Sequence, residues 1–225
     1  MTIPVRSTKH LNWMLGKGWA IGTTARVGID KKRLYVDFIL EKPAPKPRIS
    51  GRVLGMDNNY RNGLVFSDGR MTGQGVYKMT QSFGKREKNT HKQCKEIMNR
   101  SINRIDFDGV KVLSIENLKH VKSNKRGKFP RQLNRRMSHW LYAHTVDRLS
   151  QRCEELGIRL VYKSPWKTSQ RCSVCGKWDR RSRNGDEFLC IYCGHEDHSD
   201  LNAAKNLELL GLAGAYGLRS LKSSG

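Results

Sequence analysis

The sequence contains no apolar stretch of about 18 residues, the length that a helix needs to cross a bilayer. Its start, MTIPVRSTKHLNWML, has no apolar segment of signal-peptide length. We therefore expect a soluble, cytoplasmic protein. The sequence also shows no evident internal repeat, and its basic residues are spread through patterned segments instead of low-complexity runs, which argues against a basic tail.

Acidic residues are scarce in comparison with basic ones. The 225 residues include 43 Lys+Arg and 20 Asp+Glu, so the formal net charge is +23. A charge of this size favours polyanionic partners, and nucleic acid is the leading candidate. The alternative is a basic protein whose charge serves solubility. The length allows one domain with a small satellite.

The N-terminal region is predicted to form a small β unit. Residues 19–42 alternate apolar and polar positions as half-buried strands do, and GIDKK marks a turn between two strands. PAPKP at 43–47 then places three prolines in five residues, which prevents regular pairing. We place a boundary there, so that residues 1–47 form a short β unit followed by a linker.

Beyond this boundary the patterning predicts a mixed α/β domain. A short apolar run such as VKVLSIENL is typical of a buried strand, whereas apolar positions at helical spacing predict amphipathic helices. The predicted order is a hairpin from 53–56 and 64–66, a third strand near 75–81, a helix over 86–104, a strand over 110–118, a helix from 133 to about 157, a fifth strand, a cysteine-containing insert and a helix from about 200.

Four of the six cysteines form two C-x-x-C pairs separated by fourteen residues. This spacing is close to that of zinc ribbons, and the glycine after each pair allows the backbone to turn so that two thiolates can reach one ion. A closed tetrahedral thiolate site is structural, not catalytic. The predicted Zn²⁺ ligands are Cys172, Cys175, Cys190 and Cys193.

The remaining candidates near the cysteines have simpler interpretations. His195 could replace one cysteine ligand, but we interpret it as a surface residue. Cys94 and Cys153 each lie on an apolar helix stripe and are interpreted as core residues.

Two basic clusters are predicted to contact nucleic-acid phosphates, although either could be a solvated face. One cluster lies between 121 and 136, where there are seven cations and no acid, and the other lies between the two cysteine pairs. Their members are Lys122, Lys125, Arg126, Lys128, Arg131, Arg135, Arg136, Arg180, Arg181 and Arg183.

Three acids occur where buried elements begin or end. Asp57 ends the apolar run VLGMD, Glu116 ends VLSIE, and Asp200 opens the helix in HSDLNAAKNL. Buried carboxylates are costly unless a positive partner compensates them, and a cluster of three favours Mg²⁺ or Mn²⁺. Such ions can activate water for phosphodiester hydrolysis. Singly, Asp57 could be a turn residue, Glu116 a lysine partner and Asp200 an N-cap.

Jointly, three acids in this order match an RNase H-like nuclease core. The segments GMDNNYRNGLVFSDG, IENL, SPWKTSQRCSVCG, CIYCG and DLNAAKNL resemble the TnpB (OrfB) family of transposon-associated proteins, relatives of the compact type V CRISPR effectors. The match covers about residues 50–210. Where the family often has Asp-x-Gly, this chain has Asp57-Asn58-Asn59, and Asn is expected to tolerate the unusual backbone angles of that turn.

The resemblance implies a RuvC-like (RNase H-like) mixed sheet with flanking helices and an inserted zinc ribbon. The split nuclease core would comprise 48–166 and 195–225, with the ribbon at 167–194 and a β-barrel remnant at 19–42. Asp57, Glu116 and Asp200 would be the acids of the three nuclease motifs. The family also implies DNA cleavage guided by a transposon-encoded RNA.

Three functions are compatible with the sequence. The first is a metal-dependent DNA endonuclease, guided by or bound to RNA. The second is a guide-independent nuclease that recognises branched DNA, as a homodimer. The third is a non-catalytic zinc-containing nucleic-acid binder, against which the three acids argue. Copurifying RNA would distinguish the first two.

Overall fold

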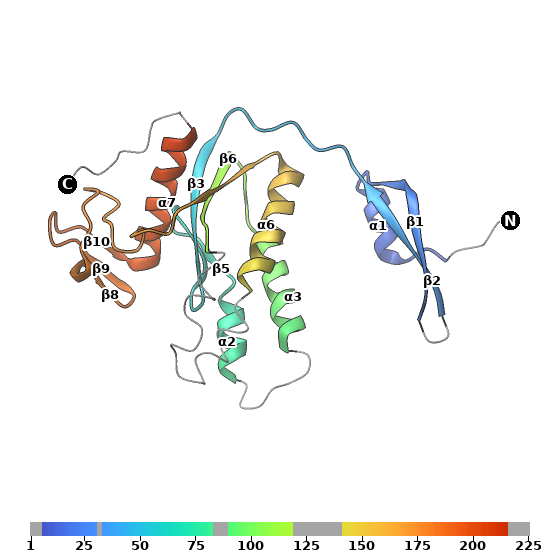
Figure 1. Cartoon of the computed structure of the whole chain (residues 1–225), viewed down its shortest axis with the longest axis horizontal. Helices are drawn as coiled ribbons and strands as arrows, with labels where there is room; N and C mark the ends of the chain where they lie inside the picture. The colour runs from blue at the N-terminus through green and yellow to red at the C-terminus, as the bar shows by residue number, and fades with distance from the viewer. Residues whose placement is uncertain (1–5, 31–32, 83–89, 119–140, 216–225) are drawn as a thin grey trace. The chain divides into compact units, whose positions relative to one another are not determined.

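The computed structural model describes residues 6–30, 33–82, 90–118 and 141–215 of the chain (Figure 1). The chain divides into two compact units, Met1–Pro45 and Lys46–Gly225. No helix in these ranges is both long and apolar enough for a membrane crossing.

The N-terminal unit consists of a short helix and a hairpin. Helix α1 (Lys9–Gly16) begins after Thr8, whose side chain accepts a hydrogen bond from the Leu11 amide. Strands β1 (Ala20–Asp30) and β2 (Arg33–Glu41) pair antiparallel, as the alternation predicts, with a register shift between Ile21 and Ala25. None of the described residues from 6 to 47 is fully buried.

The larger unit is built on a five-stranded mixed sheet with the order β5-β4-β3-β6-β7. Strands β3, β4 and β5 pair antiparallel, whereas β3, β6 and β7 run parallel. The bounds are β3 (Arg52–Asn59), β4 (Gly63–Phe66), β5 (Met71–Thr72), β6 (Val110–Glu116) and β7 (Arg159–Lys163).

Helices cover both faces of this sheet (Figure 1). On one face, β3 and β6 contribute Leu54, Met56, Leu113 and Ile115 to a core shared with α3 (Thr90–Asn103) and α6 (Tyr142–Leu156). Helix α2 (Gln74–Ser82) adds Val76 to the same core, whereas α7 (Ser199–Ala215) packs against β3 and β6 on the other face.

Most of the predicted elements are present, with one clear error. Residues 75–81, expected to form a third strand, belong to helix α2. The segment contains β-branched residues, but Val76, Met79 and Thr80 follow helical spacing and turn toward the core. The third strand is the two-residue β5, and Gly73, with φ of 86°, lies between it and the helix.

Other boundaries agree more closely. Helix α6 ends where the sequence predicts, because Gly157 caps it in the left-handed conformation with φ of 67°. Residues 133–140, expected to form its start, lie outside the described residues. Cys94 and Cys153 are buried in the core, as predicted.

Candidate active site and metal centre

The first two predicted acids lie side by side at the carboxyl ends of parallel strands. Met56 of β3 is in register with Ile115 of β6, so Asp57 and Glu116 are the next residues along each strand. Side chains alternate between the faces of a sheet, which places both carboxylates on the face opposite Met56 and Ile115. That face is the one that α7 covers.

Helix α7 brings the third acid to the same edge. It can approach β3 closely because residue 55 is glycine: a Cβ there would collide with the backbone of α7 at Ala204 and Glu208. Gly211 plays the reciprocal role, since a Cβ on it would meet Val53 and Ser114 at 2.7 and 2.8 Å. This close packing seats the first turn of α7, and therefore Asp200, beside the ends of the strands.

Hydrogen bonds from outside the helix orient the Asp200 carboxylate. Its Oδ1 accepts from Asn59 Nδ2 at 3.0 Å, and its Oδ2 accepts from Asn62 Nδ2 at 2.7 Å. Arg183 Nη2 lies 3.4 Å from Oδ1. Only 1% of the Asp200 side chain is exposed. Asp200 is therefore held by the turn after β3 and by an arginine of the cysteine-containing segment, which an N-cap role does not explain.

The turn after Asp57 is built differently from the expectation. Asn58 and Asn59 need no left-handed backbone, because Lys167 is the one non-glycine residue with positive φ in the described part of the chain. Gly63, with φ of 72°, supplies the unusual angle instead. Asn59 accepts the Arg61 amide at 2.7 Å, which leaves its Nδ2 group for Asp200.

The site concentrates negative charge in a buried setting. Burial, followed by repulsion from Glu116 and Asp200, raises the pKa of Asp57 well above its usual value. Burial also raises the pKa of Glu116, against the opposing effects of Thr168, which donates a hydrogen bond to Oε1, and of Arg183. A bound cation would relieve the mutual repulsion of these carboxylates.

The oxygen-only donor set suits Mg²⁺ or Mn²⁺ better than a soft metal. Among the described His, Cys, Asp and Glu residues, four cysteines are the one group whose ligand atoms all lie within 4.8 Å of one another.

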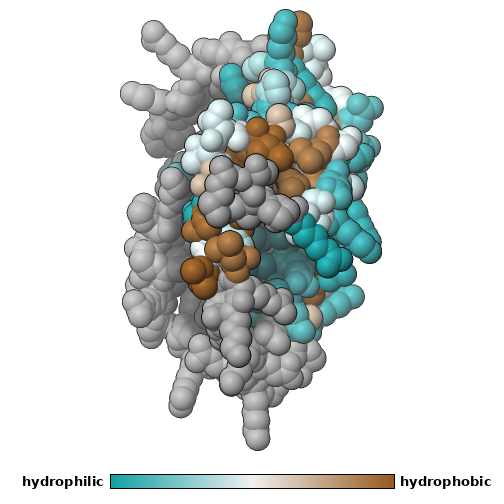
Figure 2. Space-filling view, turned by 90° about the vertical axis from the view of Figure 1, so that its right-hand side faces the viewer, coloured by the Kyte–Doolittle hydropathy of each residue, from teal (hydrophilic) through white to brown (hydrophobic). Residues whose placement is uncertain are grey.

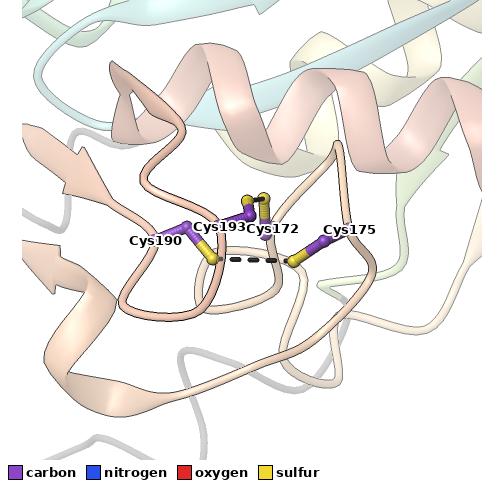
Figure 3. A group of neighbouring side chains, drawn as sticks. All are labelled: Cys172, Cys175, Cys190 and Cys193. Carbon is purple, nitrogen blue, oxygen red and sulfur yellow. Dashed lines mark hydrogen bonds between the residues drawn. The ribbon is translucent and has the colours of Figure 1, made fainter.

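The four cysteine sulfurs converge as the sequence predicts (Figure 3). Cys172 and Cys193 Sγ are 3.7 Å apart, and Cys175 and Cys190 Sγ are 3.6 Å apart. Zn–S bonds of about 2.3 Å in a tetrahedron imply sulfur–sulfur edges of about 3.8 Å. The arrangement is therefore compatible with a structural zinc ion.

Two backbone turns with the same hydrogen bonds present these sulfurs. The Gly176 amide donates to Cys172 O at 3.0 Å, and the Gly194 amide donates to Cys190 O at 2.9 Å. Both glycines are left-handed, with φ of 73° and 71°. The segment also contains three short strands, β8 (Arg183–Asn184), β9 (Glu187–Leu189) and β10 (Glu196–His198), and a 3-10 turn, η1 (Arg180–Ser182).

Two buried asparagines of α7 fasten the cysteine-containing segment to this helix. Asn202 accepts the Ser173 amide at 2.9 Å and donates to Arg171 O at 2.7 Å. Asn206, one turn later, donates to Arg171 O at 2.7 Å and to Thr168 O at 2.9 Å. The same helix therefore carries an acid of the candidate active site and the anchor of the cysteine centre.

The structure describes three of the ten cations that are predicted to contact nucleic acid. Arg183 lies beside Asp200, and Arg181 pairs with Asp179 at 3.0 Å, whereas Arg180 is exposed. His195 contributes to no four-ligand cluster in the described ranges, and its Nε2 lies 3.6 Å from Asp197 Oδ2. Outside the described residues lie Lys122, Lys125, Arg126, Lys128, Arg131, Arg135 and Arg136.

Comparison with known proteins gives matches to TnpB-like and Cas12f1 proteins. The model of the Cas12f1-like TNB domain matches residues 142–207. The CRISPR-associated endodeoxyribonuclease Cas12f1 of Sulfoacidibacillus thermotolerans is 38% identical over 77 residues, which are 34% of this chain and 18% of that protein. A TnpB-like protein of Aquifex aeolicus is 33% identical over 109 residues, which are 47% of this chain and 35% of that protein. The resemblance to TnpB and type V effector proteins is confirmed.

Solved structures of type V effectors are also similar. A cryo-EM structure of a Cas12f1–sgRNA–target DNA complex matches with a TM-score of 0.49 and 18% identity, covering 84% of this chain and 64% of that one. CasPhi-2 (Cas12j) bound to crRNA matches with a TM-score of 0.42 and 18% identity, covering 60% and 23%. The chain thus spans less than two thirds of the length of these type V relatives.

Sequence reasoning missed the polar residues that assemble the site. Asn59, Asn62, Thr168, Asn202 and Asn206 each bind an acid or the cysteine-containing segment. The signal available was the position of the asparagines: Asn202 and Asn206 lie four residues apart beside small residues in DLNAAKNL, so they share one helix face.

Proposed function

We propose that this TnpB-like chain is a divalent-metal-dependent DNA endonuclease with a RuvC-like active site formed by Asp57, Glu116 and Asp200. The observation that carries the proposal is that two buried acids, Asp57 of β3 and Asp200 of α7, and the half-buried Glu116 of β6 lie at one edge of the sheet. The strand order β5-β4-β3-β6-β7, with its antiparallel and parallel halves, supports an RNase H-like core.

The carboxylates would hold Mg²⁺ or Mn²⁺, which supplies Lewis-acid stabilisation and a water of lowered pKa. The protein's own contribution is positioning: Asn59 and Asn62 orient Asp200, while Thr168 orients Glu116. Arg183, whose side chain is 29% exposed and lies 3.4 Å from Asp200, would also contact a scissile phosphate. The cationic surface would hold the substrate backbone by contacts that do not read bases.

The four cysteines would hold one structural zinc ion. Their sulfur spacing fits a tetrahedral site, and the shell is closed, so we assign it no catalytic step. The proposed organisation is a nuclease core of 48–166 and 195–225, a zinc ribbon at 167–194, and a separate N-terminal β unit at 1–47.

An RNA guide is proposed from the relatives. The Cas12f1 neighbour was solved with sgRNA and target DNA, and the CasPhi-2 neighbour with crRNA. If this chain uses RNA in the same way, purification from its native context should recover a bound transcript.

The test combines guide identification with cleavage. Copurifying RNA is sequenced, and the complex is incubated with matching and non-matching DNA, with and without Mg²⁺. We expect cleavage that requires Mg²⁺, and its loss in Asp57→Ala, Glu116→Ala and Asp200→Ala by about 1000-fold or more, which corresponds to about 4 kcal/mol. Cleavage of branched DNA without RNA would favour the guide-independent alternative, and wild-type cleavage by Asp200→Ala would refute the active site.

A further inference from the structure

Thr168 lies between strand β6 and helix α7 and forms a hydrogen bond with each. Its hydroxyl donates to Glu116 Oε1, and its carbonyl oxygen accepts from Asn206 Nδ2 at 2.9 Å. Thr168 and Asn206 are 3% and 2% exposed, and a buried hydrogen bond is costly to leave unmade. Thr168 therefore connects one candidate catalytic acid to the helix that carries another, Asp200.

The turn that contains Thr168 does not by itself direct the hydroxyl to Glu116. The hydroxyl oxygen also lies 3.2 Å from Pro165 O, an acceptor within the same turn. A threonine hydroxyl carries a single proton, so the two acceptors compete for it. A contact from outside the turn is therefore needed to keep this proton on the acid.

The backbone directly before Thr168 is strained. Lys167 has φ of 57°, in the left-handed region where side chains other than Gly, Asn and Asp are uncommon. Its carbonyl oxygen accepts from the amides of Gln170 at 3.0 Å and Arg171 at 2.9 Å, which closes the turn. Strain of this kind persists only where the surrounding structure imposes it, and it is concentrated at functional sites. The turn is thus held in a shape that local preference does not favour.

Two asparagines of α7 bind this segment, but they share only one acceptor. Arg171 O accepts from Asn206 Nδ2 and from Asn202 Nδ2, each at 2.7 Å. The second bond of Asn202 is accepted from the Ser173 amide, whereas the second bond of Asn206 is donated to Thr168 O. Loss of Asn206 therefore leaves Arg171 O with a donor and releases Thr168 O. Loss of Asn202 leaves both carbonyls bound.

We propose that Asn206 is a positioning residue for the carboxylates. By fixing the Thr168 carbonyl, it keeps the Thr168 hydroxyl on Glu116 Oε1, which limits rotation of the carboxylate and leaves its other oxygen for a divalent ion. Helix α7 then supplies one acid directly and sets the geometry of a second. The inference rests on the proposed nuclease function, and it adds a residue that acts on the acids through Thr168.

The test measures ion binding in the absence of substrate. Free Mn²⁺ is followed by electron paramagnetic resonance while the reduced, zinc-loaded full chain is titrated with Mn²⁺, and binding that is lost in Asp57→Ala is assigned to the carboxylates. Asn206→Ala and Thr168→Val should each weaken this binding by about 10- to 100-fold, because both release Glu116 from the hydroxyl that orients it. Thr168→Ser, which retains a hydroxyl, should bind Mn²⁺ as the wild type does.

Asn202→Ala is the matched control. It removes a buried amide of the same helix that binds the same segment, so it should lower the Tm as Asn206→Ala does, but it should not change Mn²⁺ binding. The double variant Thr168→Val/Asn206→Ala completes a double-mutant cycle. It should bind Mn²⁺ no more weakly than Thr168→Val alone, because both changes act through one hydroxyl.

Thermal unfolding checks the fold of each variant. If Asn206→Ala does not fold, Asn206→Gln, which keeps the amide donors on a longer side chain, takes its place and should also weaken Mn²⁺ binding. Equal losses in the variants of Asn202 and Asn206 would overturn the positioning role, because they would indicate general anchoring of the segment. Multiplied losses in the double variant would overturn it as well.

Two further outcomes separate this inference from the proposed function. Asp57-dependent Mn²⁺ binding that is insensitive to Asn206→Ala would remove the positioning role alone. Absence of Asp57-dependent binding in the wild type would remove the proposed function and, with it, the role of Asn206.

Discussion

The two units of the chain use apolar residues in opposite ways. The larger unit buries them on both faces of a sheet, whereas the N-terminal hairpin exposes them: Val27, Ile29 and Leu34 are 64%, 77% and 59% exposed. The space-filling view shows hydrophobic surface among hydrophilic residues (Figure 2). Backbone pairing holds the hairpin, and an isolated two-stranded hairpin is marginally stable in water. Alternation alone therefore specifies a strand without specifying a core.

The largest expected effect concerns the cysteine centre, which lies in a part of the larger unit that has little core. Its buried apolar cluster comprises only Phe188 and two of the cysteines, Cys172 and Cys190. We expect one zinc ion per chain and loss of ordered structure in the ribbon in Cys172→Ser, because structural zinc contributes about 10–16 kcal/mol in small zinc-finger peptides. Metal analysis and hydrogen exchange measure both effects. Protection of the ribbon that survives in the variant would contradict this role.

The second prediction compares two glycines at which substitution by alanine would place a new Cβ against a neighbouring residue. In Gly55→Ala the Cβ meets the backbone of α7, so helix and strand must separate, at a cost of about 3 kcal/mol. In Gly28→Ala of the hairpin it meets the end of the Tyr35 side chain, which can rotate away. Denaturant unfolding should show a large loss for the first and little change for the second; equal losses would mean that α7 does not pack so closely.

The third prediction concerns buried charge in protein free of divalent ions. Because the pKa of Asp57 is raised on folding, the folded state keeps a proton that the unfolded state has lost, and stability falls as the pH rises above the ordinary carboxyl value. Asp57→Asn should therefore raise the Tm near pH 7, by about 2–4 °C for each kcal/mol relieved, and the difference should vanish near pH 4.

The exposed Asp37 of β2 supplies the control for this measurement. Asp37→Asn should leave the Tm unchanged at both pH values, and Mg²⁺ should stabilise the wild type more than Asp57→Asn. If the Tm difference for Asp57→Asn is the same at pH 4 and pH 7, burial and the neighbouring carboxylates do not raise the pKa of Asp57.

The smallest effect is expected for removal of the hairpin. A chain that begins at residue 46 keeps Arg48, whose guanidinium donates to Phe107 O at 2.7 Å, Val110 O at 2.9 Å and Leu156 O at 3.0 Å. Its Tm should change by less than about 2 °C, because less than about 1 kcal/mol is lost. A chain that begins at residue 51 loses those bonds and should be clearly less stable. A large drop for the first truncation would contradict the division into two units.

The sequence predicted features that depend on local pattern. Buried strands, the glycine cap of α6 and the cysteine spacing follow from periodicity and short-range geometry. Features that depend on tertiary contacts were not predictable in the same way. Thr168 reaches Glu116 across 52 residues, and Asn62 reaches Asp200 across 138, and neither partner has a local signature. The 75–81 segment, predicted as a strand, belongs to helix α2, whose buried face depends on packing against the core.

Helix α7 also limits the positions at which related chains can gain or lose residues. Asp200 accepts a hydrogen bond from Asn62, while Asn202 and Asn206 bind the cysteine-containing segment, so the angular relation of the three residues around the helix is fixed. One residue inserted between Asp200 and Asn202 would rotate Asp200 relative to Asn202 and Asn206 by about 100° around the helix axis, because a turn takes 3.6 residues. Natural relatives should therefore tolerate insertions between the two cysteine pairs, in 176–189, but keep the count from 200 to 206 constant.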